Sequence, residues 1–293
     1  ITRYRSPNRQ AMRRASRSRR SISSRFSRWR FARLIARWRS LPACPRVVKA
    51  AGRTRSGSYP ASMPEGSASP RETRSIAHFP LENVVLLPRV RVPLHIFEPR
   101  YRQMVREVLE GDGEHVIGMT VVRPSETGAM QGNPDVFPIG CQGTIERFEA
   151  LPQGRFNVVL AGTTRFRIDS ESPPEGDRLY RIAHVVPIAD ANPASDRERV
   201  SALRSEVFEL MRMLLRVIAP SRVEAFEQQP FAELDDEQFV NSFAQSIDFA
   251  PAEKQGLLEA DRIAERYEKL VGLLRFRLAE LTSGGQPGPS VMQ

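Results

Sequence analysis

The sequence predicts an α+β protein, in which a β-rich part with one internal helix precedes a part made of helices. Between about residues 76 and 190, short apolar runs are separated by Gly and Pro. This spacing is typical of a curled sheet or a small barrel rather than of a parallel α/β sheet. From about residue 195 to residue 282, apolar residues recur with the period of a helix.

Five stretches of the first part have the composition of strands. They are residues 79–88, 92–98, 115–122, 143–168 and 180–189. The stretch 143–168 contains two apolar runs joined at Pro152-Gln153-Gly154, which predicts a hairpin because Pro and Gly favour tight turns.

The internal helix is predicted to follow directly from a strand, in the stretch "VPLHIFEPRYRQM" at residues 92–104. The alternation of residues 92–97 predicts a strand covered on both faces, with Val92, Leu94 and Ile96 on one face and Pro93, His95 and Phe97 on the other. Pro99 suits the first position of a helix, and Glu98 places a carboxylate at the positive end of its dipole. We expect this helix to span residues 99–110.

The second part is predicted to form a helical subdomain over residues 195–282. One apolar stripe runs from Val200 to Ile218, Asp235 has the position of a helix cap, Pro251 can begin another helix, and a long last helix follows. The join at residues 189–196 contains Asn192-Pro193, so we expect few contacts there and a separate core on each side.

The net charge of +10 is unevenly distributed along the chain. Residues 1–62 contain 17 Arg and one Lys and no acidic residue, which leaves a net charge of −8 on residues 63–293. Residues 1–75 are therefore predicted to be a basic, disordered leader, and the polar, Gly- and Pro-rich residues 283–293 a disordered tail.

Three interpretations of the basic segment remain open. The favoured one is that the native protein starts at Met63 and that the residues before it are translated leader sequence. The others are a targeting or membrane-surface helix and a basic arm for nucleic acid with aromatic residues for stacking.

The remaining composition predicts a cytoplasmic protein without a membrane span. Cys141 is the single cysteine after residue 62, which fits a reducing compartment. No stretch reaches the roughly 18 to 20 apolar residues that a membrane helix needs.

The residues predict no catalytic, cofactor or metal site. None of the three lysines follows a Gly, which excludes the phosphate loop of a nucleotide motor. His78, His95, His115 and His184 are scattered without metal-ligand spacing. Cys141 lies between glycines and is predicted to be a small strand residue.

Residues 79–112, "FPLENVVLLPRVRVPLHIFEPRYRQMVREVLEGD", closely resemble the start of the N-terminal substrate-binding domain of Lon-type ATP-dependent proteases. The matching positions are Leu94, Ile96, Phe97, Glu98, Arg100 and Tyr101. A second signature is similar at Gly143, Gly162 and Arg165-Phe166. The resemblance covers about residues 76–280.

The resemblance implies a PUA-like pseudo-barrel at residues 76–190 followed by helices. It also implies that this chain is a stand-alone domain, because the motor and the Ser-Lys dyad of the proteases are missing from it. For the six matched residues at the corner we expect a structural role, with Glu98 and Arg100 fixing the strand-to-helix join.

The leading functional hypothesis is a non-catalytic module that recognises unfolded or tagged polypeptides and delivers them to an ATP-dependent protease. We expect such binding to use apolar clefts and exposed strand edges. The alternative is an RNA-binding PUA-like protein, which the net charge of −8 opposes. A peptidase in its own right is disfavoured because no nucleophile-base pair is visible.

Overall fold

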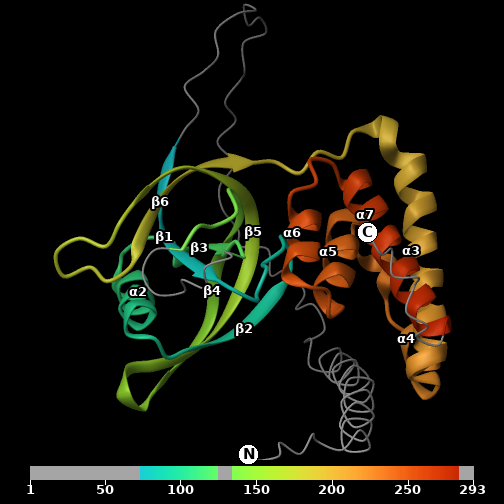
Figure 1. Cartoon of the computed structure of the whole chain (residues 1–293), viewed down its shortest axis with the longest axis horizontal. Coiled ribbons are helices and arrows are strands. Elements are labelled where there is room, and N and C mark those ends of the chain that lie inside the picture. The colour runs from blue at the N-terminus through green and yellow to red at the C-terminus, as the bar shows by residue number, and fades with distance from the viewer. Residues whose placement is uncertain (1–72, 125–133, 284–293) are drawn as a thin grey trace, which may run out of the picture.

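The computed structural model describes residues 73–124 and 134–283 (Figure 1). Its strands are β1 (Arg74–Leu81), β2 (Arg91–Ile96), β3 (Val116–Val121), β4 (Ile139–Leu151), β5 (Arg155–Ser172) and β6 (Arg181–Ile188). Its helices are α2 (Pro99–Glu110), α3 (Arg197–Ile218), α4 (Val223–Glu227), α5 (Asp236–Ser246), α6 (Pro251–Leu258) and α7 (Ile263–Thr282). The α+β class is confirmed, whereas the predictions for the leader before residue 73 and for residues 284–293 lie outside the described residues.

The six strands form one sheet in the order β2-β5-β4-β3-β1-β6, and β6 also pairs with β5. The long strand β5 pairs with two different strands along its length. Its residues 156–161 pair with β2, and its residues 165–172 pair with β6. Only β1 and β3 are parallel. Among the described strands, β2 alone has a partner on one side only along its whole length. A PUA-like pseudo-barrel remains a prediction.

Several local predictions are confirmed. The internal helix spans residues 99–110, and the β4–β5 hairpin turns at Gln153 and Gly154, whose φ angles are 65° and 68°. Both angles lie in the left-handed region that Gly adopts without strain. Asp235 caps α5, since its Oδ1 accepts the Gln238 N–H at 2.7 Å. No helix within the two described ranges is long and apolar enough to cross a membrane.

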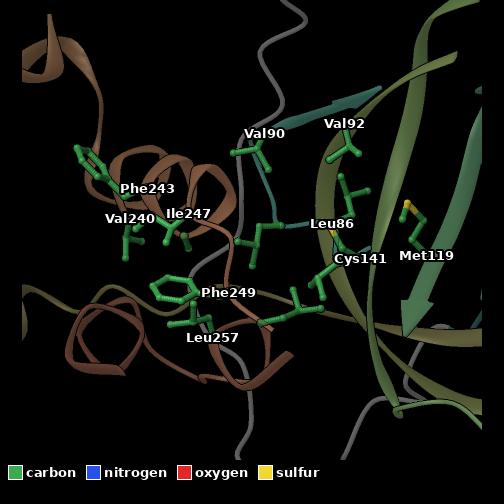
Figure 2. Close-up of a cluster of buried hydrophobic side chains, with 14 of the residues drawn as sticks. Leu86, Val90, Val92, Met119, Cys141, Val240, Phe243, Ile247, Phe249 and Leu257 are labelled. Carbon is green, nitrogen blue, oxygen red and sulfur yellow. The ribbon is translucent and has the colours of Figure 1, made fainter. Parts of the chain in front are cut away.

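The apolar run at residues 79–88 is not one strand, contrary to the prediction. β1 ends at Leu81, and Leu86 and Leu87 are buried in an irregular segment between the sheet and the helices (Figure 2). The run is apolar because it is covered on both sides, and periodicity cannot distinguish such a segment from a buried strand.

Two glycines of the second signature make room for this segment. A Cβ at Gly162 would lie 2.1 Å from the carbonyl oxygen of Leu87, and a Cβ at Gly143 would lie 2.6 Å from Leu160 and 2.8 Å from Leu86. All three distances are shorter than van der Waals contact. The backbone of Leu87 therefore approaches β5 closely at Gly162, and the side chains of Leu160 and Leu86 fill the space beside Gly143.

The hydrophobic core is continuous from the sheet to the helices, so the expectation of two separate cores is wrong. Figure 2 shows Leu86 beside Cys141 of the sheet, with the labelled residues of the helical part on its other side. These residues are Val240 and Phe243 of α5, Leu257 of α6, and Ile247 and Phe249 between the two helices. The segment that joins β1 to β2 fills the space between the halves and makes their core continuous. A small separate cluster of Phe166, Ala183 and Val185 lies on β5 and β6.

A buried polar network crosses the same junction. Arg165 of β5 and Arg266 of α7 are both 0% exposed, and both contact Asp190 of the linker, with Arg165 Nε 2.9 Å from Asp190 Oδ1. Arg165 Nη1 also donates to the carbonyl oxygens of Leu258 at 3.0 Å and Ala260 at 2.8 Å.

Arg266 extends the network to the irregular segment. Its Nη1 donates to Asn241 Oδ1 at 2.9 Å, and Asn241 Nδ2 donates to the carbonyl oxygen of Pro88 at 3.0 Å. The linker, expected to make few contacts, therefore supplies the shared counter-charge of two buried arginines.

Replacing Asp190 by Asn is expected to destabilise the whole molecule, because two buried guanidinium groups would lose their carboxylate. Leaving a buried charge uncompensated costs about 3 to 5 kcal/mol. Urea unfolding measures the loss, and the continuous core predicts one cooperative transition for both halves.

Glu268→Gln is the matched control, because Glu268 pairs with Arg199 on the surface, where an ion pair contributes about 1 kcal/mol or less. Equal effects of the two changes, or separate transitions of sheet and helices in the native protein, would contradict the buried junction.

Candidate functional site

The strand-to-helix corner holds its polar signature residues by short contacts. Glu98 precedes α2, and its carboxylate accepts Arg100 Nε at 2.9 Å. The guanidinium carbon of Arg100 lies 4.5 Å from the centroid of the Tyr101 ring. These contacts favour the expected structural role of Glu98 and Arg100 at the join.

Tyr101 anchors the helix to the sheet. Its hydroxyl donates to the carbonyl oxygen of Pro80 at 3.0 Å, and its ring meets Phe79 edge-on at 4.5 Å between centroids. Burial raises the pKa of Tyr101 to about 12, so the hydroxyl stays a hydrogen-bond donor at neutral pH. Ile96 is buried beside it in the core, and Leu94 is half-buried.

The strand β2 is covered on one face only, which corrects the prediction of cover on both. Pro93, His95 and Phe97 are exposed, and the side chain of Phe97 is 61% exposed. The outward face of β2 therefore carries apolar side chains that no other part of the described structure buries. The ring of Phe97 leaves apolar surface exposed on this face.

A hollow of about 430 Å³ lies beside this face, where β2, β4 and β5 run next to one another. Its lining residues are Pro93, Leu94, His95, Arg147, Phe148, Glu149, Asn157, Val158 and Val159. Phe148 is 55% exposed. The hollow therefore combines apolar surface with a few polar groups, as ligand sites do.

Hydrogen bonds hold the polar side chains of the hollow in place across three strands. His95 Nδ1 lies 2.8 Å from Asn157 Oδ1, and Asn157 Nδ2 donates to Glu149 Oε2 at 2.9 Å. The His95 and Phe97 rings are stacked with centroids 6.1 Å apart. Because Arg147 and Glu149 carry opposite charges, the lining does not form a basic patch.

The sequence singled out Phe97 as a signature residue with an expected structural role, and it did not single out Phe148. Phe148 lies in the stretch Glu146-Arg147-Phe148-Glu149, where charged neighbours surround a single aromatic residue. That pattern is the signal of an exposed strand end, and the hairpin prediction already placed it near the turn. The convergence of the two phenylalanine-bearing strands depends on the pairing of β2 with β5, which the sequence does not show.

A second arrangement that the sequence did not reveal is a hydroxyl, an imidazole and a carboxylate in line. His78 Nε2 lies 2.7 Å from Thr120 Oγ1, and His78 Nδ1 lies 2.6 Å from Glu171 Oε1. Arg181 Nη1 is 3.2 Å from the same carboxylate oxygen. Thr120 is 2% exposed, so this line ties strands together inside the sheet rather than facing a substrate.

The other predicted residues are dispersed. Cys141 is a buried, unpaired residue of β4, and burial raises the pKa of its thiol, so it is unreactive. His184 lies between Ser75 and Ser172, away from His95. Within the described part of the chain, no group of three or more His, Cys, Asp or Glu residues could hold a metal ion.

The fold and the hollow define an α+β domain with an open, partly apolar binding surface. Residues 75–275 match the family of the ATP-dependent protease La (LON) substrate-binding domain. The match covers more than half of the chain, and the chain belongs to this family.

Curated relatives and a solved structure agree with this family. A Lon protease of Cytophaga hutchinsonii is 27% identical over 67% of this chain and 23% of its own length. A Lon protease of Flavobacterium johnsoniae is 26% identical over 71% of this chain and 24% of its own length. The chain thus spans about a quarter of these relatives.

The solved N-terminal domain of the Mycobacterium avium complex Lon protease is similar in fold. It has a TM-score of 0.51 and 17% identity over 73% of this chain and 100% of that domain.

The carboxylate of Glu171 is expected to make stability depend on pH. The hydrogen bond from His78 lowers the pKa of Glu171 from its usual 4.5, the nearby charges of His78 and Arg181 act in the same direction, and burial opposes them. The stabilisation is therefore present above about pH 4.5 and is lost as the pH falls through the lowered value. The native protein should be more stable to urea than Glu171→Gln, and this difference in stability should shrink as the pH falls from 5 to 3.

Urea midpoints at each pH measure this advantage. Glu175→Gln, in the exposed loop after β5, is the control and should leave the pH profile unchanged. A difference between native protein and Glu171→Gln that stays constant down to pH 3 would refute the assignment.

Proposed function

We propose that this chain is a non-catalytic module that binds unfolded or tagged polypeptides and presents them to an ATP-dependent protease. The observation that carries the proposal is the hollow between β2, β4 and β5, which the exposed Phe148 lines. The exposed ring of Phe97 stacks on His95, another lining residue. Membership of a substrate-binding family supports it. We also propose a cytoplasmic location and a PUA-like pseudo-barrel, which the additional β5–β6 pairing supports.

The chemistry of the hollow fits many extended polypeptides better than one small molecule. Its aromatic and aliphatic surface can accept apolar side chains that a folded client would bury. Its polar groups can pair with polar side chains and with charged side chains of either sign. Such a surface binds many sequences at modest affinity, as a module for unfolded proteins requires.

RNA is the less favoured ligand. Phosphate binding needs clustered Lys or Arg, whereas Arg147 is accompanied by Glu149 in the lining and Arg91 is paired with Glu146, with Arg91 Nε 2.6 Å from Glu146 Oε2. The aromatic rings alone would also suit base stacking, so the salt dependence of binding must separate the two ligands.

The non-catalytic role is part of the proposal. Its support is the sequence, which offers no phosphate loop, and the burial of Thr120 in the hydroxyl-imidazole-carboxylate line. A nucleophile must reach the bond that it attacks, and this hydroxyl lies inside the sheet.

Replacing Phe97 or Phe148 by Ser is expected to weaken the binding of a reduced, carboxymethylated, permanently unfolded protein to the full-length chain. Each change should raise the Kd about threefold to tenfold, because the loss of an aromatic contact at an interface costs on the order of 1 kcal/mol. The Kd is measured by fluorescence anisotropy of the labelled unfolded protein, at salt concentrations from about 50 to about 200 mM. Binding should persist at the higher salt.

Phe276→Ser is the matched control, because Phe276 of α7 is 56% exposed, close to the 61% of Phe97 and the 55% of Phe148, and lies outside the hollow. A labelled single-stranded RNA is the competing ligand. Equal losses with all three variants would refute the site, and RNA binding that the Phe97 and Phe148 changes abolish would favour the alternative function.

A further inference from the structure

The strand β2 has one side without a partner strand, and a proline occupies the middle of that strand. Val92, Pro93 and Leu94 are matched with Leu160, Val159 and Val158 of β5. Antiparallel matches alternate between pairs that exchange hydrogen bonds and pairs that do not. Because proline has no N–H, Pro93 and Val159 form a pair that does not exchange hydrogen bonds.

A neighbouring hydrogen bond shows the same alternation of residues that bond to β5 and residues that do not. Gly162 donates its N–H to the carbonyl oxygen of Val90 at 2.8 Å, which places the bonding groups of even-numbered β2 residues toward β5. The backbone groups of Pro93 and His95 therefore point to the unpartnered side. At the centre of this side the donor that an added strand would need is missing.

The other strands are less open than β2, because each pairs with a strand on both sides along part of its length, and β6 pairs with both β1 and β5. The end of β4, residues 147–151, pairs with β5 alone. Among the described strands, β2 is the one that is open on one side along its whole length, and Pro93 interrupts that side. Prolines at such positions are a common means of preventing edge-to-edge pairing.

We propose, on the basis of the function proposed above, that the hollow binds extended polypeptides through their side chains and that Pro93 prevents them from adding as a strand to β2. The sequence predicted that apolar clefts and exposed strand edges both bind polypeptides, and the proposal keeps only the cleft. The network of His95, Asn157 and Glu149 fixes the side-chain surface before a client arrives, so recognition does not need a new backbone ladder.

An edge interrupted by Pro93 suits a module that must release the polypeptides it binds. An unfolded chain offers many free N–H and C=O groups, and a complete strand edge would pair with them cooperatively. Such pairing is also the route by which exposed edges aggregate. Side-chain contacts in an open hollow are individually weak and can be exchanged.

Backbone N-methylation tests the proposal, because it removes amide donors and leaves the side chains in place. The probes are a ten-residue peptide from the strongest-binding stretch of the carboxymethylated unfolded protein and two versions N-methylated at alternate amides, one for each register. Anisotropy gives the Kd of each probe for the full-length native chain and for Pro93→Thr, which restores the N–H with a strand-forming residue. Pro174→Thr, in the exposed loop after β5, is the control.

The native chain and the control should bind all three peptides within about threefold of one another. Pro93→Thr should bind the unmodified peptide more tightly and lose tenfold or more with one methylated register, because several main-chain hydrogen bonds would be lost together. A tenfold loss in one register with the native chain, or a Pro93→Thr variant that behaves as the native chain does, would overturn the proposal while leaving the binding function standing. No binding of any peptide by the native chain would overturn the proposed function itself. If Pro93→Thr fails to fold, the comparison on the native chain decides alone.

Discussion

The contact of Arg165 and Arg266 with Asp190 is the constraint on which the rest of the structure depends. Two guanidinium groups without solvent exposure require a carboxylate and several carbonyl oxygens, and these come from the linker, α6 and the residues after it. The sheet and the helices therefore cannot be placed independently of each other. The network also reaches Pro88 through Asn241, so it fixes the segment that leads into β2. The position of the exposed face of β2 follows from this buried junction.

The second signature gains a physical meaning from this arrangement. Gly143 and Gly162 allow the segment before β2 to pass close to β4 and β5, and Arg165 lies three residues further along the same strand as Gly162. Small residues and a buried charge at neighbouring positions of one face thus build the contact between the two halves. The first signature has the complementary part, because Tyr101 holds α2 to β1 while Phe97 is left outside. One family pattern includes both residues that stabilise the fold and a residue available for binding.

The sequence predicted the local elements because their causes are local. Pro99 begins a helix, the Gln153-Gly154 turn closes a hairpin, and Asp235 caps α5, each through backbone preferences within a few residues. Residues 84–87 were misinterpreted because a buried irregular segment and a buried strand have the same apolar composition. The hollow could be predicted only in part. The signature singled out Phe97, but with an expected structural role. The meeting of β2 with the end of β4 depends on both strands pairing with β5, a long-range choice that no local pattern contains.

The central claim is that clients contact the hollow between β2, β4 and β5 rather than another exposed apolar surface. Site-specific photo-crosslinking tests it most directly. A photoreactive phenylalanine analogue is placed at position 97, 148 or 276 of the full-length chain, and crosslinks to a labelled unfolded protein are counted after illumination. The account predicts efficient crosslinking from positions 97 and 148, with competition by excess unlabelled unfolded protein, and little from position 276. Crosslinking from position 276 that equals or exceeds that from positions 97 and 148 would contradict it.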